Sequence, residues 1–244
     1  MALALLFALL GSAGAVAAGS AILLFRGRAS PLLPALVSYA TGTLLAASLL
    51  AMLPSALERE SDSVVLGLLL GGVVLFFVLE RLMIWRHRHP GGHHVRGDAS
   101  RELILLGDAV HNLMDGFAIG AAFAEGGSLG VSTAMAVIVH EVAQEAGDFA
   151  ILLDGGLSRG RALVYNTLSS LTTIPAAMVA YVSASSVEQV IPVALAIAAA
   201  SFLYIALADL VPRHHAEGTI RELPMELALI GLGIGTIGGL SLLS

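Results

Sequence analysis

Long apolar stretches, separated by short segments rich in glycine, proline or charged residues, fill nearly the whole chain. A helix that spans a membrane needs about 20 mainly apolar residues, and eight stretches reach that length. They run over approximately residues 2–25, 32–57, 63–85, 101–124, 130–153, 161–183, 188–212 and 222–243. The pattern predicts an all-α, polytopic membrane protein whose eight transmembrane helices form a single domain over residues 1–244.

The first stretch could also be read as a signal peptide, because it contains the small-residue run GSAGAVAAGS. It has no basic segment ahead of its apolar part, and Arg26 and Arg28 follow it. These features predict that it is retained as a helix.

The composition agrees with a helical membrane bundle. Hydrophobic residues make up 57% of the chain and charged residues 12%, whereas soluble domains carry about 25% charged residues. The 27 glycines suit close packing of helices. Because the chain has no cysteine, any metal must be held by nitrogen and oxygen donors. The net charge of −6 and the lack of a GxxxxGK loop predict no nucleic-acid partner and no organic cofactor.

The basic residues predict the orientation in the membrane. Eleven of the twelve arginines lie in or beside the loops that follow the first, third, fifth and seventh stretches, and Arg59 is the exception. The alternate loops carry acidic residues such as Glu58, Glu125 and Glu188. Since cytoplasmic loops collect positive charge, both termini are expected on the non-cytoplasmic side of a plasma (inner) membrane.

Two stretches resemble each other weakly. The second ends AMLPSALE and the seventh ends ALADLVPRHH, so each has a proline near its C-terminal end. The two helices would run in opposite directions, and transporters are often built from inverted repeats. Proline near a helix end is common, however, so the similarity alone does not establish a repeat.

Polar side chains gather near the middle of two stretches, where a bilayer makes them costly and where they usually mark a site or a pathway. They are Asp108, His111, Asn112 and Asp115 in the fourth stretch, and His140, Glu141, Gln144, Glu145 and Asp148 in the fifth. Residues four apart share a helix face, which pairs His111 with Asp115 and His140 with Gln144. Membrane helices also use buried polar residues to bond to one another, but nine of them with a repeated spacing favour a metal site.

The donor types indicate which ions such a site would take. Imidazole, carboxylate and amide groups together suit borderline divalent ions such as Zn²⁺, Fe²⁺, Mn²⁺ and Cd²⁺. A metal held only for stability prefers a closed shell of strong ligands, whereas transport needs ligands that exchange. The amides therefore favour transport.

These same residues resemble a known family. HNLMDGFAIGAAF is similar to the fourth-helix signature of the ZIP (Zrt/Irt-like) metal transporters, and HEVAQEAGDFAILL resembles the fifth-helix HExPxExGD signature of one ZIP subfamily. LFFVLERLMIWRHRH, the histidine-bearing loop after it and FLYIALADLVP also resemble that subfamily, so the similarity covers most of the chain. The resemblance implies a bundle of eight helices with both termini outside. It also implies a binuclear transport site of His111, Asn112, Asp115, His140, Glu141 and Gln144, in which Asp115 and Gln144 bridge the ions.

Several positions depart from the family pattern. Gln144 stands where many relatives have His or Glu, and a neutral amide bridges two cations poorly. Ala143 replaces the signature proline, and in the second stretch Ala51 and Ser55 replace residues that could act as ligands. We therefore expect one well-held ion and a weaker or absent second. Met52 in the same stretch is expected to pack in the core.

Other polar residues are weaker candidates. The loop over residues 86–101 is expected on the cytoplasmic side, where it either binds metal loosely or is simply hydrated. Glu80 is expected to pair with Arg81. The remaining candidates are His87, His89, His93 and His94 in the loop, Asp209 with His214 or His215 as an exit site, Asp148 further inward along the pathway, and Asn166 as a cavity-lining or packing residue.

The sequence thus predicts a transporter that carries divalent metal ions, zinc foremost, into the cytoplasm by alternating access. Protonation of His111 or His140 would weaken metal binding and promote release. The alternatives are an intramembrane metal-dependent hydrolase, although HEVAQ lacks the second histidine of HExxH, and a metal sensor without flux. The expected partners are the lipid bilayer and the metal ions, and the small-residue face GLGIGTIGG could pack within one protomer or form a homodimer.

Overall fold

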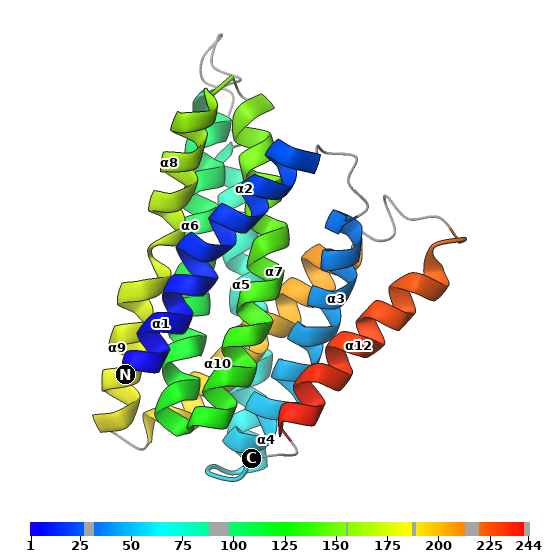
Figure 1. Ribbon diagram of the computed structural model, residues 1–244. Coiled ribbons are helices and arrows are strands. Elements are labelled where there is room, and N and C mark those ends of the chain that lie inside the picture. The colour runs from blue at the N-terminus through cyan, green and yellow to red at the C-terminus, as the bar shows by residue number, and fades with distance from the viewer. Residues whose placement is uncertain (27–31, 88–97, 155, 187–188, 213–219, 242–244) are drawn as a thin grey trace.

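The computed structural model describes residues 1–26, 32–87, 98–154, 156–186, 189–212 and 220–241. The described residues are helical apart from short turns, as Figure 1 shows. The elements are α1 (Ala2–Leu9), η1 (Leu10–Gly14), α2 (Ala15–Arg26), α3 (Leu32–Ala46), η2 (Ala47–Met52), α4 (Leu53–Leu57), α5 (Asp62–His87), α6 (Asp98–Glu125), α7 (Gly127–Asp154), α8 (Arg159–Ser170), α9 (Thr173–Ser186), α10 (Val190–Tyr204), η3 (Ile205–Leu210) and α12 (Leu223–Ser241). The η elements are π-helical stretches that continue the neighbouring α-helices.

Within the described residues, six helical segments are long and apolar enough to cross a membrane. They are Ala2–Phe25, Pro34–Leu57, Asp62–Leu82, Arg159–Ala184, Val190–Ala208 and Leu223–Leu240. The predicted polytopic membrane protein is therefore confirmed. Helices α6 and α7 have 28 residues each and are long enough to span, but they carry the polar clusters. That α6 and α7 also span the membrane, which would bring the number of spans to eight, stays a prediction.

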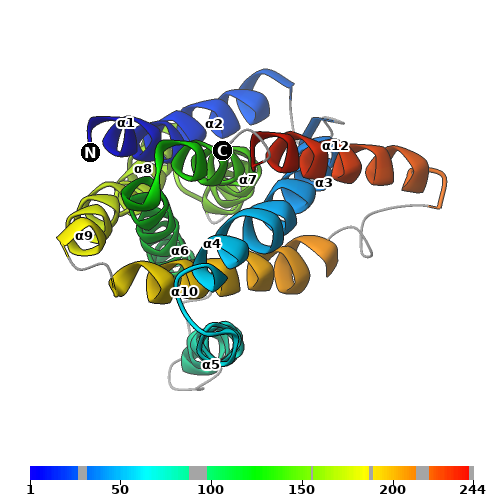
Figure 2. The same ribbon diagram turned by 90° about the horizontal axis from the view of Figure 1, so that it is seen from below.

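Helices α6 and α7 occupy the interior of the bundle. Helix α6 packs against α7, α8, α9 and α10, while α7 packs against α2, α3 and α6. Figure 2 shows both helices enclosed by the others, with α5 and α12 at the periphery. The interior position explains how these two helices can carry charge, because their polar faces meet each other and not lipid.

Small residues let α6 approach α9 closely. A Cβ atom added at Gly116 would collide with the backbone carbonyl of Thr173, and one at Gly120 would collide with that of Ala177. Only glycine fits where two backbones meet in this way. The contact holds the start of α9 beside the polar face of α6.

A break between α8 and α9 puts polar groups next to α6. Helix α8 ends at Ser170 and α9 begins at Thr173. Pro175 has no N–H to continue the regular hydrogen-bond ladder, so the chain turns here. The hydroxyl of Thr172 donates to the carbonyl of Ala109 on α6, at 2.8 Å. The break therefore anchors these hydroxyl-bearing residues against the middle of α6.

The second and seventh stretches share a local irregularity. The π-helical stretch η2 lies just before Pro54, and η3 lies just before Pro212. A proline removes one hydrogen bond from the helix ladder, and a π-helical turn is one way to accommodate the change. The two stretches also contact each other, since the Ser48 hydroxyl donates to the carbonyl of Ala199 at 2.8 Å. The inverted repeat itself stays a prediction, because η1 in the first stretch is π-helical too and has no proline near it.

The helix ends are distributed as the arginine pattern requires. The start of α1, the end of α12, the α4–α5 turn and the α6–α7 turn all lie at one end of the bundle (Figure 1). At that end, Arg59 forms an ion pair with Glu125 at 2.7 Å. The end of α2 and the junction between α7 and α8 lie at the other end. Which end faces the cytoplasm stays a prediction.

Helix α12 uses part of its small-residue face within the protomer. A Cβ at Gly233 would collide with the carbonyl of Tyr39 on α3, and the Tyr39 hydroxyl donates to Thr236 at 3.0 Å. Gly231, Gly235 and Gly239 have open space beside them. One side of α12 therefore packs against α3 within the protomer. A homodimer formed through the other side stays a prediction.

Candidate metal centre

Four side chains from α6 and α7 bring their donor atoms together inside the bundle. Asp115 Oδ2 lies 3.0 Å from His140 Nε2, and Glu141 Oε1 lies 3.1 Å from His111 Nε2. The two imidazole Nε2 atoms are 3.1 Å apart. One donor atom from each of the four residues lies within 4.8 Å of the others. We call His111, Asp115, His140 and Glu141 the histidine centre.

The helical spacing explains why these residues meet. His111 and Asp115 are four residues apart on α6 and point from one face, while His140 and Glu141 are adjacent on α7. His140 is oriented by its other ring nitrogen, since Nδ1 lies 3.0 Å from the carbonyl of Ala136. Its ring also meets the Phe202 ring edge-on at 6.1 Å between centroids. Such contacts fix the imidazole so that Nε2 points at the other donors.

The histidine centre is buried except on one side. The side chains of Asp115, His140 and Glu141 are at most 1% exposed, whereas that of His111 is 16% exposed. A cavity of about 330 Å³ has His111 in its lining. Its lining comes from α5, α6, α7, α10 and η3, and the polar members are Glu80, Asp108, His111, Gln144, Asp148, Ser201 and Tyr204. An ion held by the four donors could therefore leave through this cavity.

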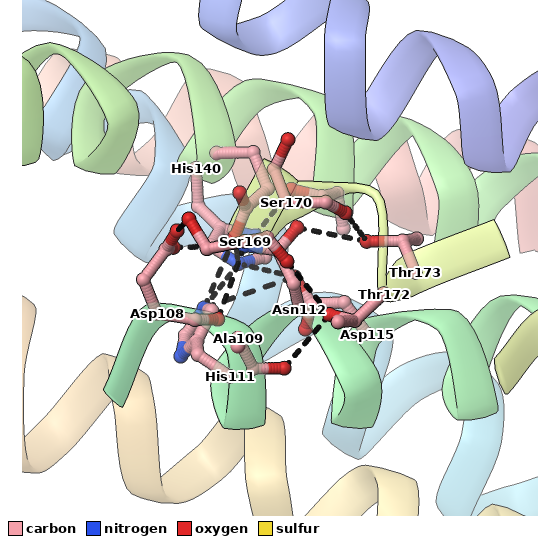
Figure 3. A network of polar contacts seen from close by, with 12 residues as sticks. Asp108, Ala109, His111, Asn112, Asp115, His140, Ser169, Ser170, Thr172 and Thr173 are labelled. Atoms are coloured by element: carbon pink, nitrogen blue, oxygen red, sulfur yellow. Dashed lines mark hydrogen bonds and ion pairs between the residues drawn. The ribbon is translucent and has the colours of Figure 1, made fainter. Parts of the chain in front are cut away.

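Hydrogen bonds from the break between α8 and α9 position the polar face of α6 (Figure 3). The amide of Asn112 donates to Asp108 Oδ1 at 2.8 Å, and its oxygen accepts from the Thr173 hydroxyl at 2.8 Å. The Ser169 hydroxyl donates to Asp108 Oδ2. Both ends of the Asn112 amide are thus engaged by protein groups, and Asn112 serves here to hold Asp108 in place.

Two of the six predicted ligands therefore stand apart from the other four. Asn112 lies in this hydrogen-bond network, and Gln144 lines the cavity beside His111. Asp108 was expected near the site but outside the ligand set, and the structure places it next to Asn112. The contributions of Ser169 and Thr173 were missed, although the run NTLSSLTT in the sixth stretch is an unusual concentration of hydroxyl groups for a transmembrane segment.

The structure also decides most of the weaker candidates. Glu80 accepts a hydrogen bond from the Tyr204 hydroxyl, and Arg81 lies over the Phe77 ring, so the expected pairing of Glu80 with Arg81 is wrong. Asn166 donates to the backbone carbonyl of Glu145, which is the packing role. Met52 is fully buried in the core, as expected. Asp148 lines the cavity. The other weaker candidates lie outside the described part of the chain. They are the side chains of His87 and Asp209 and the residues His89, His93, His94, His214 and His215.

The hydrogen bond from Thr173 to Asn112 gives a specific expectation. Replacing Thr173 with Val keeps the side-chain shape but removes the donor, so Asn112 and Asp108 lose part of their support. Changes to groups that orient a metal site weaken affinity about 10–100-fold, and we expect about 10-fold weaker zinc binding by calorimetry. The matched control is Thr167→Val, because the Thr167 hydroxyl bonds only within its own helix. Equal affinities in the two variants would contradict the positioning role.

A bundle of apolar helices that encloses a His, Asp and Glu cluster defines a polytopic membrane protein with a candidate site for divalent metal. The family model for the ZIP zinc transporter matches residues 87–241, which is more than half of the chain. The chain belongs to the ZIP zinc transporter family.

Curated relatives agree with this assignment. The human zinc transporter ZIP4 is 42% identical over 141 residues, covering 58% of this chain and 21% of the relative. Human ZIP10 is 34% identical over 150 residues, covering 57% of this chain and 18% of the relative. Human ZIP6 is 42% identical over 110 residues, covering 45% of this chain and 15% of the relative. The aligned part of the chain therefore spans about a fifth or less of the length of these relatives.

Proposed function

We propose that the protein carries divalent transition-metal ions, zinc foremost, across the membrane into the cytoplasm through the histidine centre on α6 and α7. One observation carries the proposal. Two imidazoles and two carboxylates converge in the interior of a membrane bundle, and a cavity reaches them from one side. The family supports the same function, since its relatives are named as zinc transporters. Nitrogen and oxygen donors together suit zinc, and they also admit iron, manganese and cadmium.

The position of the cavity supports alternating access. Its lining residues on α5 and α7 come from the later halves of these helices, and those on α6 come from its earlier half apart from Met114. This is the half of the bundle that is predicted to face the cytoplasm. On the other side of the centre, Met52, Ile119 and Ala122 are fully buried. This arrangement corresponds to a state open inward and closed outward, as a transporter would adopt when it releases its ion.

Ion binding at the centre follows from its chemistry. A divalent ion would replace its water shell with the imidazole nitrogens of His111 and His140 and the carboxylates of Asp115 and Glu141. The two negative charges would offset the charge of the ion inside the bilayer. Because His111 faces the cavity, it is placed to be the last ligand to let go of the ion on the way inward.

The alternatives have less support. A hydrolase of the HExxH type would need a second histidine, and this position is Gln144. A sensor would bind metal without moving it. Purified protein in liposomes distinguishes these functions. We expect zinc uptake by the parent that exceeds uptake by empty liposomes and that falls to the empty-liposome level in Asp115→Ala. Binding without uptake by the parent would contradict transport, and parallel assays with iron, manganese and cadmium would give the selectivity.

The predicted orientation can be tested by labelling, because the chain has no native cysteine. Ser61 is exposed in the α4–α5 turn, and Ser158 is exposed before α8, at the opposite end of the bundle. With both termini outside an inner membrane, a membrane-impermeant maleimide should label Ser61→Cys in spheroplasts. It should label Ser158→Cys only after lysis. The reverse labelling pattern would mean that the protein has the opposite orientation in the membrane. The proposed transport would then run out of the cytoplasm.

A further inference from the structure

We propose that Asp108, Glu141 and Glu145 form a second divalent-cation site, built only from carboxylate oxygens and joined to the histidine centre through Glu141. We call these three residues the carboxylate centre. The inference rests on the proposed function, because the second ion would also be cargo. It differs from the site implied by the family resemblance, in which Asp115 and Gln144 bridge the two ions.

The three carboxylates lie close together in the interior. One oxygen from each lies within 4.8 Å of the others. Glu141 and Glu145 are fully buried, and Asp108 is 4% exposed. Glu145 is one turn beyond Glu141 on α7, and Asp108 is nearly one turn before His111 on α6. Because a short turn makes these helices antiparallel, both shifts move toward the same end of the bundle, so the two centres lie one after the other.

Glu145 supports the assignment of an ion to this cluster. It is fully buried, and in the described part of the chain no donor group bonds to either of its carboxylate oxygens. The same holds for Glu141 Oε2. Asp108 differs, since Asn112 and Ser169 hold it in place and leave it facing the two glutamates. A buried carboxylate without a partner is costly, and three together repel one another.

Among the described residues, no basic side chain forms an ion pair with Asp108 or Glu145. Glu141 pairs through Oε1 with the two histidines of the histidine centre, whereas its Oε2 has no such partner. A divalent cation would offset the negative charges and supply the missing partner for Glu145.

The chemistry of the carboxylate centre differs from that of the histidine centre. Oxygen donors without nitrogen suit harder ions such as Mn²⁺, whereas imidazole raises the preference for zinc. Asp108 and His111 both line the cavity, so each centre would have one ligand that faces it. Two linked sites of moderate strength let an ion enter and still leave.

The test is a competition between two metals on the purified full chain in detergent. The protein is first loaded with one equivalent of zinc, which binds N/O sites more tightly than manganese does. Mn²⁺ is then titrated and free Mn²⁺ is followed by electron paramagnetic resonance. We expect the parent to bind about one Mn²⁺ per chain in addition to zinc. Loss of a ligand should weaken Mn²⁺ binding at least about 10-fold in Glu145→Gln and in Asp108→Asn, and Glu145→Gln should retain zinc.

A control variant on α12 tests whether these effects are specific to the carboxylate centre. Glu226→Gln makes the same chemical change on α12, away from both centres, and should bind both metals like the parent. Size-exclusion chromatography shows whether each variant is folded. If one of the two variants misfolds, the other still tests the carboxylate centre. No uptake of Mn²⁺ by the zinc-loaded parent would mean that protons neutralise these carboxylates, and it would overturn the inference. Unchanged Mn²⁺ binding in the folded variants would overturn it too. A parent that binds no zinc would count against the proposed function, while manganese binding lost in Glu145→Gln would still support the carboxylate centre.

Discussion

Glu141→Gln should abolish zinc flux, with a fall of at least about 100-fold, because even changes to groups around a metal ligand cost about 10–100-fold. Glu141 Oε1 lies 3.1 Å from His111 Nε2 and 3.4 Å from His140 Nε2, so this carboxylate faces both imidazoles. The substitution keeps the side-chain shape, removes the negative charge and replaces one carboxylate oxygen by an amide NH2 group. Without that charge, one carboxylate remains to offset a divalent ion in the histidine centre. Zinc uptake into liposomes measures the effect.

Two comparisons make this result specific. Glu226→Gln carries the same chemical change at the start of α12 and should keep parental flux. Glu145→Gln should keep zinc binding, because Glu145 belongs to the carboxylate centre alone, whereas Glu141→Gln should lose it. Flux in Glu141→Gln close to the parental rate would show that this carboxylate is not a ligand of the transported ion.

Gly116→Ala should disrupt the bundle itself. The added methyl group would collide with the backbone carbonyl of Thr173, and a backbone atom cannot move aside as a flexible side chain can. Overpacking in a filled interior costs about 1–3 kcal/mol. Helix α9 must then shift away from α6, which also breaks the hydrogen bond from Thr173 to Asn112. We expect a lower midpoint of thermal unfolding in detergent and weaker zinc binding.

Gly71→Ala is the matched control, because a Cβ at Gly71 on α5 meets nothing within 4 Å. Replacing glycine in a helix by alanine stabilises it by about 0.5–1 kcal/mol where there is space. The control should therefore unfold at the parental temperature or above it. If both variants behave alike, the close approach of α6 and α9 does not limit stability.

Much of the fold could be predicted from local properties of the sequence. The predicted stretch 63–85 corresponds to α5 over Asp62–His87, and 161–183 corresponds to α8 and α9 over Arg159–Ser186. Such agreement arises because the thickness of a bilayer sets the length of an apolar helix, and that requirement acts on each segment by itself. The break between α8 and α9 follows from Pro175 but is hard to place from sequence, because its hydrogen bonds run to a different helix.

The site was predictable in part. The sequence indicates that His111 shares a face with Asp115, since four residues nearly complete a helical turn. It does not indicate how far α7 is rotated about its axis. Neighbours such as Gln144 and Glu145 point about 100° apart, so that rotation decides which of them enters the cluster. The structure turns Glu145 toward Glu141 and leaves Gln144 on the cavity.

The sequence alone determined that the chain is a helical membrane protein, that its polar chemistry lies on α6 and α7, and that its donors are nitrogen and oxygen. These properties depend on composition and on spacing within single helices. The tertiary structure decided that His111, Asp115, His140 and Glu141 converge, that Asn112 supports Asp108, and that a cavity adjoins His111. Those properties depend on contacts between helices far apart in the chain, such as Gly116 against Thr173. The close packing of small residues sets the rotation and separation of each helix there.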